Sequence, residues 1–315
     1  MLEQMQHLDK IKIKDNFKNH FSKITDFDLF MKYSLSYLRR AIRVNTLKIS
    51  VDELKSRLGK DWILDPVPWC KDGFWIKHTS GRRDIGNLPE HQLGYFYVQE
   101  PASMIPPIVL DPQPGDFILD MCASPGSKTT QLAQYMKNEG LLLANDYKGI
   151  RMKPLGLNVQ RLGLTNTILT VMKGTSFYNK GFLFDKILVD APCSGTGTIR
   201  KSLKTLQIWN PNMTKKLASE QKKLLETAFN ILKPNGIIVY STCSVEPIEN
   251  ENVVSWLLDK YENASLEEIN LNIKRTKAIT EFDNIKYNDE VKKTLRIWPQ
   301  DNDTEGFFVA KIRKH

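Results

Sequence analysis

Residues 117 to 241 alternate between short apolar runs and stretches with helical spacing. Repeated βαβ units of this kind fold as a parallel, right-handed, doubly wound α/β sheet. The apolar runs are rich in Leu and β-branched residues, as strands buried on both faces are, and comprise Phe117–Met121, Leu141–Asn145, Thr167–Met172, Lys186–Asp190 and Gly236–Ser241. The helical stretches between most of them are 127–137, 149–162 and 214–232.

The two ends of the chain depart from this alternation. Thr294–Trp298 and Phe307–Ile312 predict an antiparallel pair at the C-terminal edge of the sheet. The N-terminal part predicts a small α+β unit, with helices over 26–40 and 51–58 and strands over 41–47 and 74–77. Because the stretch Pro101–Pro114 is rich in proline, we expect an N-terminal module over residues 1–110 and the α/β domain over residues 111–315.

Charge is concentrated near the N-terminus. Residues 1–60 hold 13 Lys or Arg and 7 Asp or Glu, so this first fifth carries +6 of the net +9. A basic module predicts a polyanionic partner, nucleic acid first, although a merely solvated surface is the alternative. No apolar run is long enough to span a bilayer, and 1–14 is too polar for a secretory signal. We therefore expect a cytoplasmic protein with no membrane partner.

Two of the four cysteines follow apolar runs directly. Cys193 lies three residues beyond Asp190, and Cys243 lies three beyond Tyr240. Open α/β sheets bind ligands at the carboxyl ends of their strands, so both thiols should lie at a site. One thiol can act as a nucleophile, and two suggest a covalent bond that is made and then broken. The alternative is a pair of small core residues. The cysteine spacing predicts neither a disulfide framework nor a metal site.

The first strand leads into a turn of small residues, Asp120–Thr129. It has one glycine where a dinucleotide fingerprint needs three, and Met121 stands where a phosphate loop needs glycine, which disfavours NAD and ATP. A lysine at the helix start can still hold a carboxylate. Asp146, which ends the second strand, suits a ribose diol unless it caps a helix. These features suit S-adenosylmethionine, with its methyl group pointing toward the two thiols.

With these residues, the chain resembles the Sun-type (Nol/Nop/Fmu) family of S-adenosylmethionine-dependent RNA cytosine carbon-5 methyltransferases. The resemblance runs from about residue 43 to 311 and rests on an ordered series of motifs: Arg43–Thr46, Gln99–Met104, Asp120–Thr129, Asp146 with Arg151 and Asn158, Asp190–Gly195, Ser241–Ser244, and Trp298-Pro299 followed by Gly306–Phe308. It implies a Rossmann-like methyltransferase fold with Cys243 as nucleophile and Cys193 assisting product release. It also implies a cofactor pocket lined by Cys122, Ala123, Ser124, Pro125, Gly126, Ser127, Lys128, Asp146, Arg151 and Asp190.

The chain departs from the family pattern at a few positions. Ser124 and Ser127 stand where the family usually has Ala and Gly, and serine is small enough for the turn to survive. Lys173 occupies the place where the family usually has an aspartate near the adenine. We therefore expect that this adenine contact is lost or supplied differently.

The implied chemistry gives three residues distinct roles. Carbon 5 of cytosine is too weak a nucleophile to attack a sulfonium methyl, but addition of the Cys243 thiolate to carbon 6 turns carbon 5 into an enamine carbon. The Asp190 carboxyl would hydrogen-bond the ring nitrogen, and Cys193 would act as base or relay when the carbon-5 proton leaves.

The partner implied by this chemistry is RNA. The target base must be unstacked, which favours single-stranded or distorted RNA. Because the chain lacks the long extensions expected of ribosome-assembly members, we expect tRNA as substrate, with ribosomal RNA as the alternative, and a monomeric protein. The basic N-terminal module would hold the RNA through phosphate contacts, each of which could instead be a solvated surface residue: Arg39, Arg40, Arg43, Arg82 and Arg83.

Three other functions fit parts of the sequence. A DNA cytosine methyltransferase would carry its nucleophile in a Pro-Cys pair such as Pro192-Cys193, but Thr242-Cys243 and the basic N-terminal region count against it. A non-catalytic RNA-binding protein could keep the cofactor fold, with Lys173 as a first sign of decay. A dithiol redox protein is the weakest alternative, because the two cysteines are 50 residues apart without a C-x-x-C motif.

Overall fold

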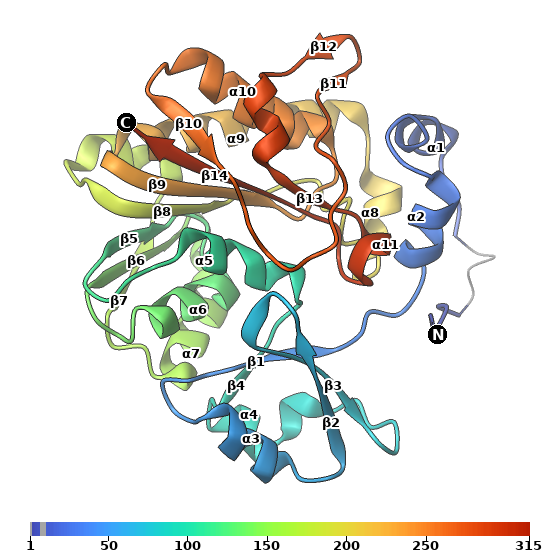
Figure 1. Cartoon of the computed structure of the whole chain (residues 1–315), viewed down its shortest axis with the longest axis vertical. Helices are drawn as coiled ribbons and strands as arrows, with labels where there is room; N and C mark the ends of the chain where they lie inside the picture. Colours follow the sequence, from blue (N-terminus) through green and yellow to red (C-terminus); the bar gives the residue numbers. More distant parts are fainter. Residues whose placement is uncertain (1, 7–10) are drawn as a thin grey trace.

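The computed structural model describes residues 2–6 and 11–315 and is dominated by one eight-stranded sheet (Figure 1). The strand order is β10-β14-β9-β8-β5-β6-β7, and β13 pairs with β14. Five strands form the parallel part, namely β5 (Phe117–Asp120), β6 (Leu141–Asp146), β7 (Thr167–Val171), β8 (Phe184–Asp190) and β9 (Leu232–Thr242). The expected doubly wound sheet is therefore confirmed.

Alternate residues of these strands fill two separate cores. Ile187 and Val189 face one side with helices α9 (Pro211–Asn230) and α10 (Glu251–Lys260), whereas Leu188 faces the other side. Helices α5 (Ile105–Leu110) and α6 (Ser127–Tyr135) cover that second side, and α7 (Met152–Leu162) lies beside β7. Because both faces are buried, each central strand contains a continuous apolar run, such as Ile187–Val189 of β8 and Gly236–Tyr240 of β9, without alternating polar residues.

The C-terminal edge of the sheet is antiparallel, as expected. β14 (Phe307–Lys314) pairs antiparallel with β9, and β13 (Leu295–Ile297) pairs antiparallel with β14. A strand that the sequence did not indicate, β10 (Ala264–Glu267), closes the edge against β14. Short elements complete this region: β11 (Glu281–Phe282), β12 (Ile285–Lys286), α8 (Lys204–Ile208) and α11 (Pro299–Asn302).

A second, four-stranded antiparallel sheet lies in the lower part of Figure 1. Its order is β2-β3-β1-β4, and its bounds are β1 (Ala41–Val44), β2 (Trp62–Val67), β3 (Cys70–His78) and β4 (Phe96–Val98). Helix α3 (Val51–Leu58), which matches the predicted range, places Leu54 and Leu58 in the core of this sheet. The short helix α4 (Pro89–Gln92) precedes β4.

The first two helices pack against the larger domain instead of this small sheet. α1 (Asp15–Phe21) and α2 (Phe27–Ser34) bury Phe17, Phe21 and Phe30 against Trp209 and Trp298. Residues 1–40 and the four-stranded sheet are therefore two distinct parts of the basic N-terminal segment. Residues 1 and 7–10 of that segment lie outside the described residues.

The helix predicted over 26–40 is too long, and this prediction is wrong at its C-terminal end. α2 ends at Ser34, and the amide of Tyr37 donates to the carbonyl of Glu3 at 2.8 Å. The chain then runs extended into β1. Local spacing of apolar residues could not reveal this pairing with a distant segment.

Candidate active site

The two cysteines meet at the carboxyl ends of neighbouring parallel strands. Asp190 at the end of β8 is in register with Ser241 of β9, and the loops that follow carry Cys193 and Cys243. Their sulfur atoms are 3.2 Å apart, at hydrogen-bond distance, and both side chains are half-buried. The contact with Cys243, and then burial, raises the pKa of the Cys193 thiol well above its usual value. The two sulfur atoms are therefore in contact, and either of them can be the donor.

Asp190 is held by two side chains from different elements. Lys128 of α6 donates to its Oδ2 at 2.7 Å, and Ser241 donates to its Oδ1 at 2.8 Å. Burial acts against the charged form of Lys128, but the charge of Asp190 and its hydrogen bond to Lys128 outweigh burial, so the pKa of Lys128 is raised. A buried ammonium is thus paired with the carboxylate at the end of β8. Sequence reasoning missed Ser241 as a contact, although it stands directly before Thr242-Cys243.

The turn between β5 and α6 brings backbone close to this end of the sheet. Gly126 has φ of +105°, and a Cβ there would lie 3.0 Å from Cδ1 of Leu155, so glycine is required. Ser124 donates its hydroxyl to the carbonyl of Arg151 at 2.8 Å, and Arg151 donates back to the carbonyl of Ser124 at 2.6 Å. Serine at position 124 therefore fits the turn, as expected.

Two buried carboxylate oxygens at this edge have no hydrogen-bond donor among the described residues: Oδ1 of Asp120 and Oδ2 of Asp146. Burial raises the pKa of Asp120 to about 7. Oδ2 of Asp146 has only the guanidinium of Arg151 at 3.3 Å, while its Oδ1 accepts from the amide of Lys148. Such orphaned acceptors fit the ribose hydroxyls and the ammonium group of S-adenosylmethionine.

The alternative role of Asp146 as a helix cap is wrong. The N-cap position of α7 is Arg151, that of the preceding 3₁₀ turn is Lys148, and neither turn nor helix receives a side-chain cap. Lys173 lies at the carboxyl end of β7, where its side chain is exposed.

Arg43 does not face solvent, and its prediction as a phosphate contact is corrected. Its guanidinium is fully buried and donates to Oε1 of Gln134, the carbonyl of Ser127 and the hydroxyl of Thr130 at 2.9–3.1 Å. These acceptors all belong to α6. A buried arginine needs such a set of partners, and Arg43 thereby joins the small sheet to the helix that follows the cofactor turn.

The other four arginines are at the surface, each with a partner from the protein. Arg39 pairs with Asp303 and stacks on Trp75, and Arg40 donates to the carbonyl of Arg83. Arg82 pairs with Asp84, and Arg83 pairs with Glu3. Exposed ion pairs of this kind contribute little to stability, so they can be exchanged for phosphates at little cost.

The doubly wound sheet, with its glycine turn after β5 and its buried carboxylate oxygens and thiol pair at the carboxyl edge, is typical of a Rossmann-like S-adenosylmethionine-dependent methyltransferase. Comparison with known families agrees. Residues 107–313 match the family model of 16S rRNA methyltransferase RsmB/F, and residues 12–101 match that of the N-terminal domain of 16S rRNA methyltransferase RsmF. The chain belongs to the RsmB/F methyltransferase family.

Individual relatives cover nearly the whole chain. The tRNA (cytosine(49)-C(5))-methyltransferase of Pyrococcus abyssi is 47% identical, over 96% of this chain and 97% of that protein. Ribosomal RNA small subunit methyltransferase F of Vibrio atlanticus is 42% identical over 96% of this chain. The match covers only 64% of the length of the Vibrio protein. A methyltransferase homolog from Pyrococcus horikoshii superimposes with a TM-score of 0.87 at 38% identity, covering 98% of this chain and 97% of that one. NSun6 from Pyrococcus horikoshii, solved with SFG, superimposes with a TM-score of 0.80 at 26% identity, covering 95% of this chain and 97% of that one.

Among residues 2–6 and 11–315, no helix is long and apolar enough to cross a membrane.

Proposed function

We propose that this chain transfers a methyl group from S-adenosylmethionine to carbon 5 of cytosine in tRNA, through a covalent adduct with Cys243. The observation that carries the proposal is the thiol pair at 3.2 Å, next to Asp190 and the cofactor turn. The matching length and 47% identity of the tRNA enzyme from Pyrococcus abyssi support tRNA over ribosomal RNA. Bisulfite sequencing of a tRNA transcript and a small-subunit rRNA fragment, each incubated with enzyme and cofactor, tests the choice. Protection of cytosines in rRNA alone would contradict tRNA as substrate.

The cofactor would be held by the turn Cys122–Lys128 together with Asp146 and Arg151. Bound there, S-adenosylmethionine supplies an electrophilic methyl group. The protein contributes the turn that admits the ligand to the backbone and two acceptors: Oδ2 of Asp146, which has an ion pair with Arg151 but no hydrogen bond among the described residues, for a ribose hydroxyl, and Asp120 for a positively charged group. With Lys173 exposed at the end of β7, the adenine would be held without the aspartate usual in the family.

The protein's own residues prepare the covalent step. The Cys243 sulfur adds to carbon 6 as a thiolate, with the Cys193 sulfur 3.2 Å away. Asp190, fixed by Lys128 and Ser241, meets the ring nitrogen. After its own proton has passed to water, the Cys193 sulfur takes the proton from carbon 5 of the adduct. The electron pair of that C–H bond restores the ring double bond and expels the Cys243 sulfur.

Asp146→Ala is expected to weaken S-adenosylmethionine binding by about 10- to 100-fold, since a hydrogen bond to a charged group contributes roughly 1.5–3 kcal/mol. The effect follows from the buried oxygen that Asp146 offers. Isothermal titration calorimetry of the two proteins measures it, with Asp52→Ala on exposed helix α3 as the control. Equal affinities in wild type and Asp146→Ala would remove Asp146 from the site.

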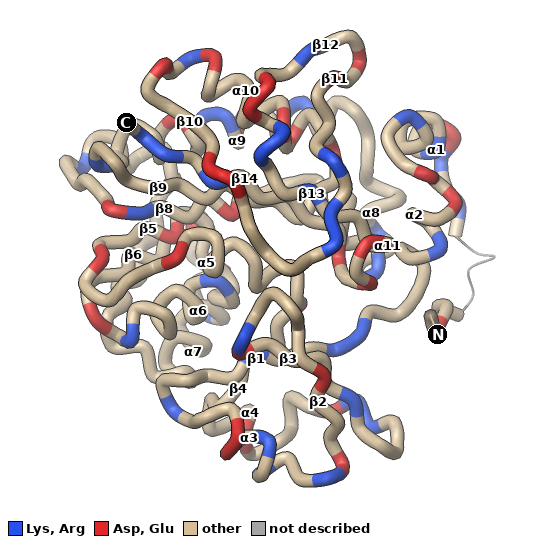
Figure 2. Tube along the Cα trace, in the orientation of Figure 1, with Lys and Arg blue, Asp and Glu red and all other residues tan. Residues whose placement is uncertain are grey.

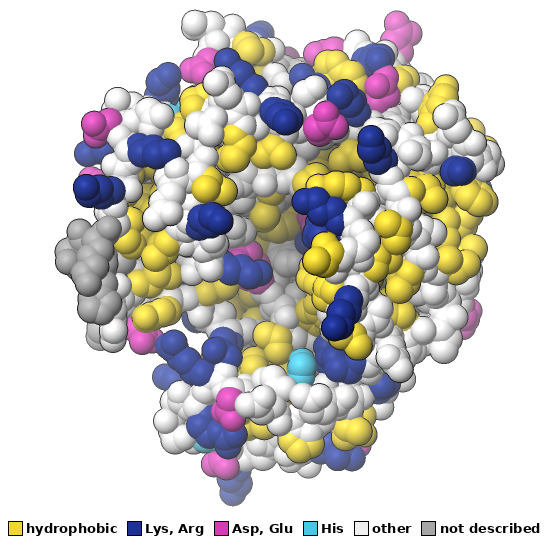
Figure 3. Space-filling model, turned by 180° about the vertical axis from the view of Figure 1, so that it is seen from behind, with side chains coloured by type: hydrophobic (Ala, Val, Ile, Leu, Met, Phe, Trp, Pro, Cys, Tyr) yellow, Lys and Arg dark blue, Asp and Glu magenta, His cyan; other side chains and the backbone are white. Residues whose placement is uncertain are grey.

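RNA would lie against a face that is hollowed and basic. Figure 3 shows a hollow on the face opposite that of Figure 1, with Lys and Arg side chains around it. Figure 2 shows basic residues on the segment between α2 and β1, where Arg39 and Arg40 lie. The loop that follows β3 adds Arg82 and Arg83 beside them, since Arg40 donates to the carbonyl of Arg83.

Replacing Arg40, Arg82 and Arg83 together with Gln is expected to flatten the salt dependence of RNA binding. Each lost phosphate contact should reduce the slope of log K against log salt by about 0.7 to 0.9, as counterion release requires. Filter binding over a salt series measures the slope. Arg57→Gln, an exposed arginine paired with Glu53 on α3, is the matched control. An unchanged slope in the triple variant would show that these arginines do not contact phosphates.

A further inference from the structure

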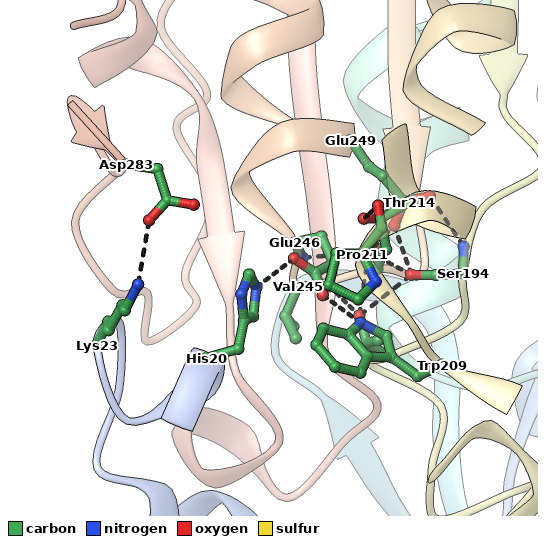
Figure 4. A network of polar contacts seen from close by, with 12 residues as sticks. His20, Lys23, Ser194, Trp209, Pro211, Thr214, Val245, Glu246, Glu249 and Asp283 are labelled. Atoms are coloured by element: carbon green, nitrogen blue, oxygen red, sulfur yellow. Dashed lines mark hydrogen bonds and ion pairs between the residues drawn. The ribbon is translucent and has the colours of Figure 1, made fainter. Parts of the chain in front are cut away.

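The two loops that carry the thiols are joined by one buried carboxylate. Glu249, in the turn before α10, has no exposed surface. Its Oε1 accepts from the amide of Ser194 at 2.9 Å and from Nε2 of Gln221 at 3.1 Å. Its Oε2 accepts from the hydroxyl of Ser244 at 2.6 Å and from the hydroxyl of Ser194. Figure 4 shows Glu249 directed at Ser194 within this network.

The residues that Glu249 binds are the immediate neighbours of the thiols. Ser194 follows Cys193, and Ser244 follows Cys243, so each cysteine is one peptide unit from the carboxylate's partners. The two serine hydroxyls are also 3.1 Å from each other, and the amide of Gly197 donates to the carbonyl of Cys243 at 3.0 Å. The loops are thus cross-linked side by side, with Glu249 at the centre of the link.

A contribution to folding stability does not by itself explain why a carboxylate is buried at position 249. Among the described residues its four contacts are all with uncharged donors, two amides and two hydroxyls, and burial raises the pKa of Glu249. Burying a carboxylate without a cation is costly, and apolar residues of the same volume often serve a core equally well. Unlike an apolar residue, the Glu249 carboxylate accepts hydrogen bonds from three donors on the two thiol loops: the amide and hydroxyl of Ser194 and the hydroxyl of Ser244.

We propose that Glu249 is a positioning residue that sets the separation of the Cys193 and Cys243 sulfur atoms. The inference rests on the proposed function for its catalytic consequence, but the separation itself is a property of the protein alone. A displacement of about 1 Å in a reacting group can lower a rate by roughly 10²-fold. Loss of Glu249 should therefore impair methyl transfer through the thiols without affecting the cofactor turn, which lies on other elements.

The direct test is the rate at which the two thiols form a disulfide in the full-length protein without RNA or cofactor. Diamide takes two electrons and two protons from the thiols and is itself reduced to the hydrazide. The product is quantified as the cross-linked Cys193–Cys243 peptide. Glu249→Leu, which removes all acceptors, is expected to cross-link about 10-fold more slowly or worse, whereas Glu249→Gln, which keeps one amide oxygen, should be intermediate.

Glu251→Gln is the matched control. Glu251 is equally buried and two residues away, but it pairs with Arg296 rather than with the thiol loops. The Glu251→Gln variant should have a lower free energy of unfolding than the wild type but should form the Cys193–Cys243 disulfide at the wild-type rate. If Glu249→Leu does not fold, Ser194→Ala, which removes only the hydroxyl that donates to Glu249, takes its place with an expected slowing of about threefold. Wild-type cross-linking rates in both Glu249→Gln and the Leu or Ser194 variant would overturn the proposal.

Methylation kinetics provide the second measurement. Glu249→Leu is expected to lower kcat by about 10²-fold with the dissociation constant of S-adenosylmethionine unchanged. Weakened cofactor binding in proportion to kcat would indicate a general structural role and contradict the proposal. If the wild type cross-links rapidly and the variant slowly, but the wild type methylates no RNA, the positioning role stands and the proposed function fails.

Discussion

Cys193→Ala is expected to accumulate a covalent protein–RNA complex that survives a denaturing gel, whereas Cys243→Ala should form none and lose methyl transfer by at least about 10⁴-fold. The two thiols are 3.2 Å apart but have opposite roles. Without Cys243 there is no bond to carbon 6. Without Cys193 the bond forms and the carbon-5 proton has no acceptor, so elimination stalls. The measurement is a denaturing gel of each variant after incubation with labelled RNA and S-adenosylmethionine, on which the adduct is a labelled protein band.

The double variant and a distant cysteine complete this experiment. The adduct of Cys193→Ala must disappear when Cys243 is also replaced, since it is the bonded sulfur. Cys70→Ser is the control, because Cys70 is a buried cysteine of β3 whose sulfur contacts the hydroxyl of Tyr135 at 3.8 Å, whereas Cys193 and Cys243 contact each other. An adduct in Cys243→Ala but not in Cys193→Ala would reverse the roles, as a DNA-type enzyme requires. Absence of an adduct in both would leave Cys193 without a role in release.

The sequence predicted the central sheet and the location of the thiols because both depend on local patterns. Strands buried on both faces are continuous apolar runs, and a residue just beyond such a run must lie at the carboxyl edge. The neighbouring pairing of β8 and β9 then brings Cys193 and Cys243 together, although 50 residues separate them. The catalytic roles of these residues stay predictions, which the gel above tests.

Long-range partners could not be predicted in this way. Arg43 appears in the sequence as one more basic residue in a basic segment, but four of its acceptors are side chains or backbone of residues 99 and 127–134. The aromatic residues of α1 similarly find Trp209 and Trp298 only in the folded chain. A single sequence does not show which residues far apart in the chain will be in contact in the fold.

The contacts of Glu249 within the site could not be predicted from the sequence either. Its signal in the sequence is an acidic residue six positions after Cys243, in the run Pro247–Glu251. Nothing local distinguishes it from Glu251, which binds Arg296 instead. Only the contact with Ser194, 55 residues earlier in the chain, separates a carboxylate between the thiol loops from one in an ordinary buried ion pair.

Asp190→Asn is expected to lower kcat for methyl transfer by about 10²- to 10³-fold, the usual range for losing one group that stabilises developing charge. The Asp190 carboxylate is about a quarter exposed, so a base can reach it, while Lys128 and Ser241 fix both of its oxygens. An amide has one acceptor oxygen for the two donors, Lys128 and Ser241, and cannot share a proton with the ring nitrogen. Single-turnover methylation of RNA at saturating cofactor measures the step.

Asp185→Asn separates this chemical role from the general effect of altering β8. Asp185 stands on the same strand at its opposite end, where it accepts from the amide of Phe117 and pairs with Lys233. Its amide variant should keep a rate close to wild type per folded molecule. Asp190→Asn should also lose adduct formation in the Cys193→Ala background, since addition to carbon 6 precedes methyl transfer. A variant that still forms the adduct at the parental rate would show that Asp190 acts after addition, and the ring-nitrogen contact would then be wrong.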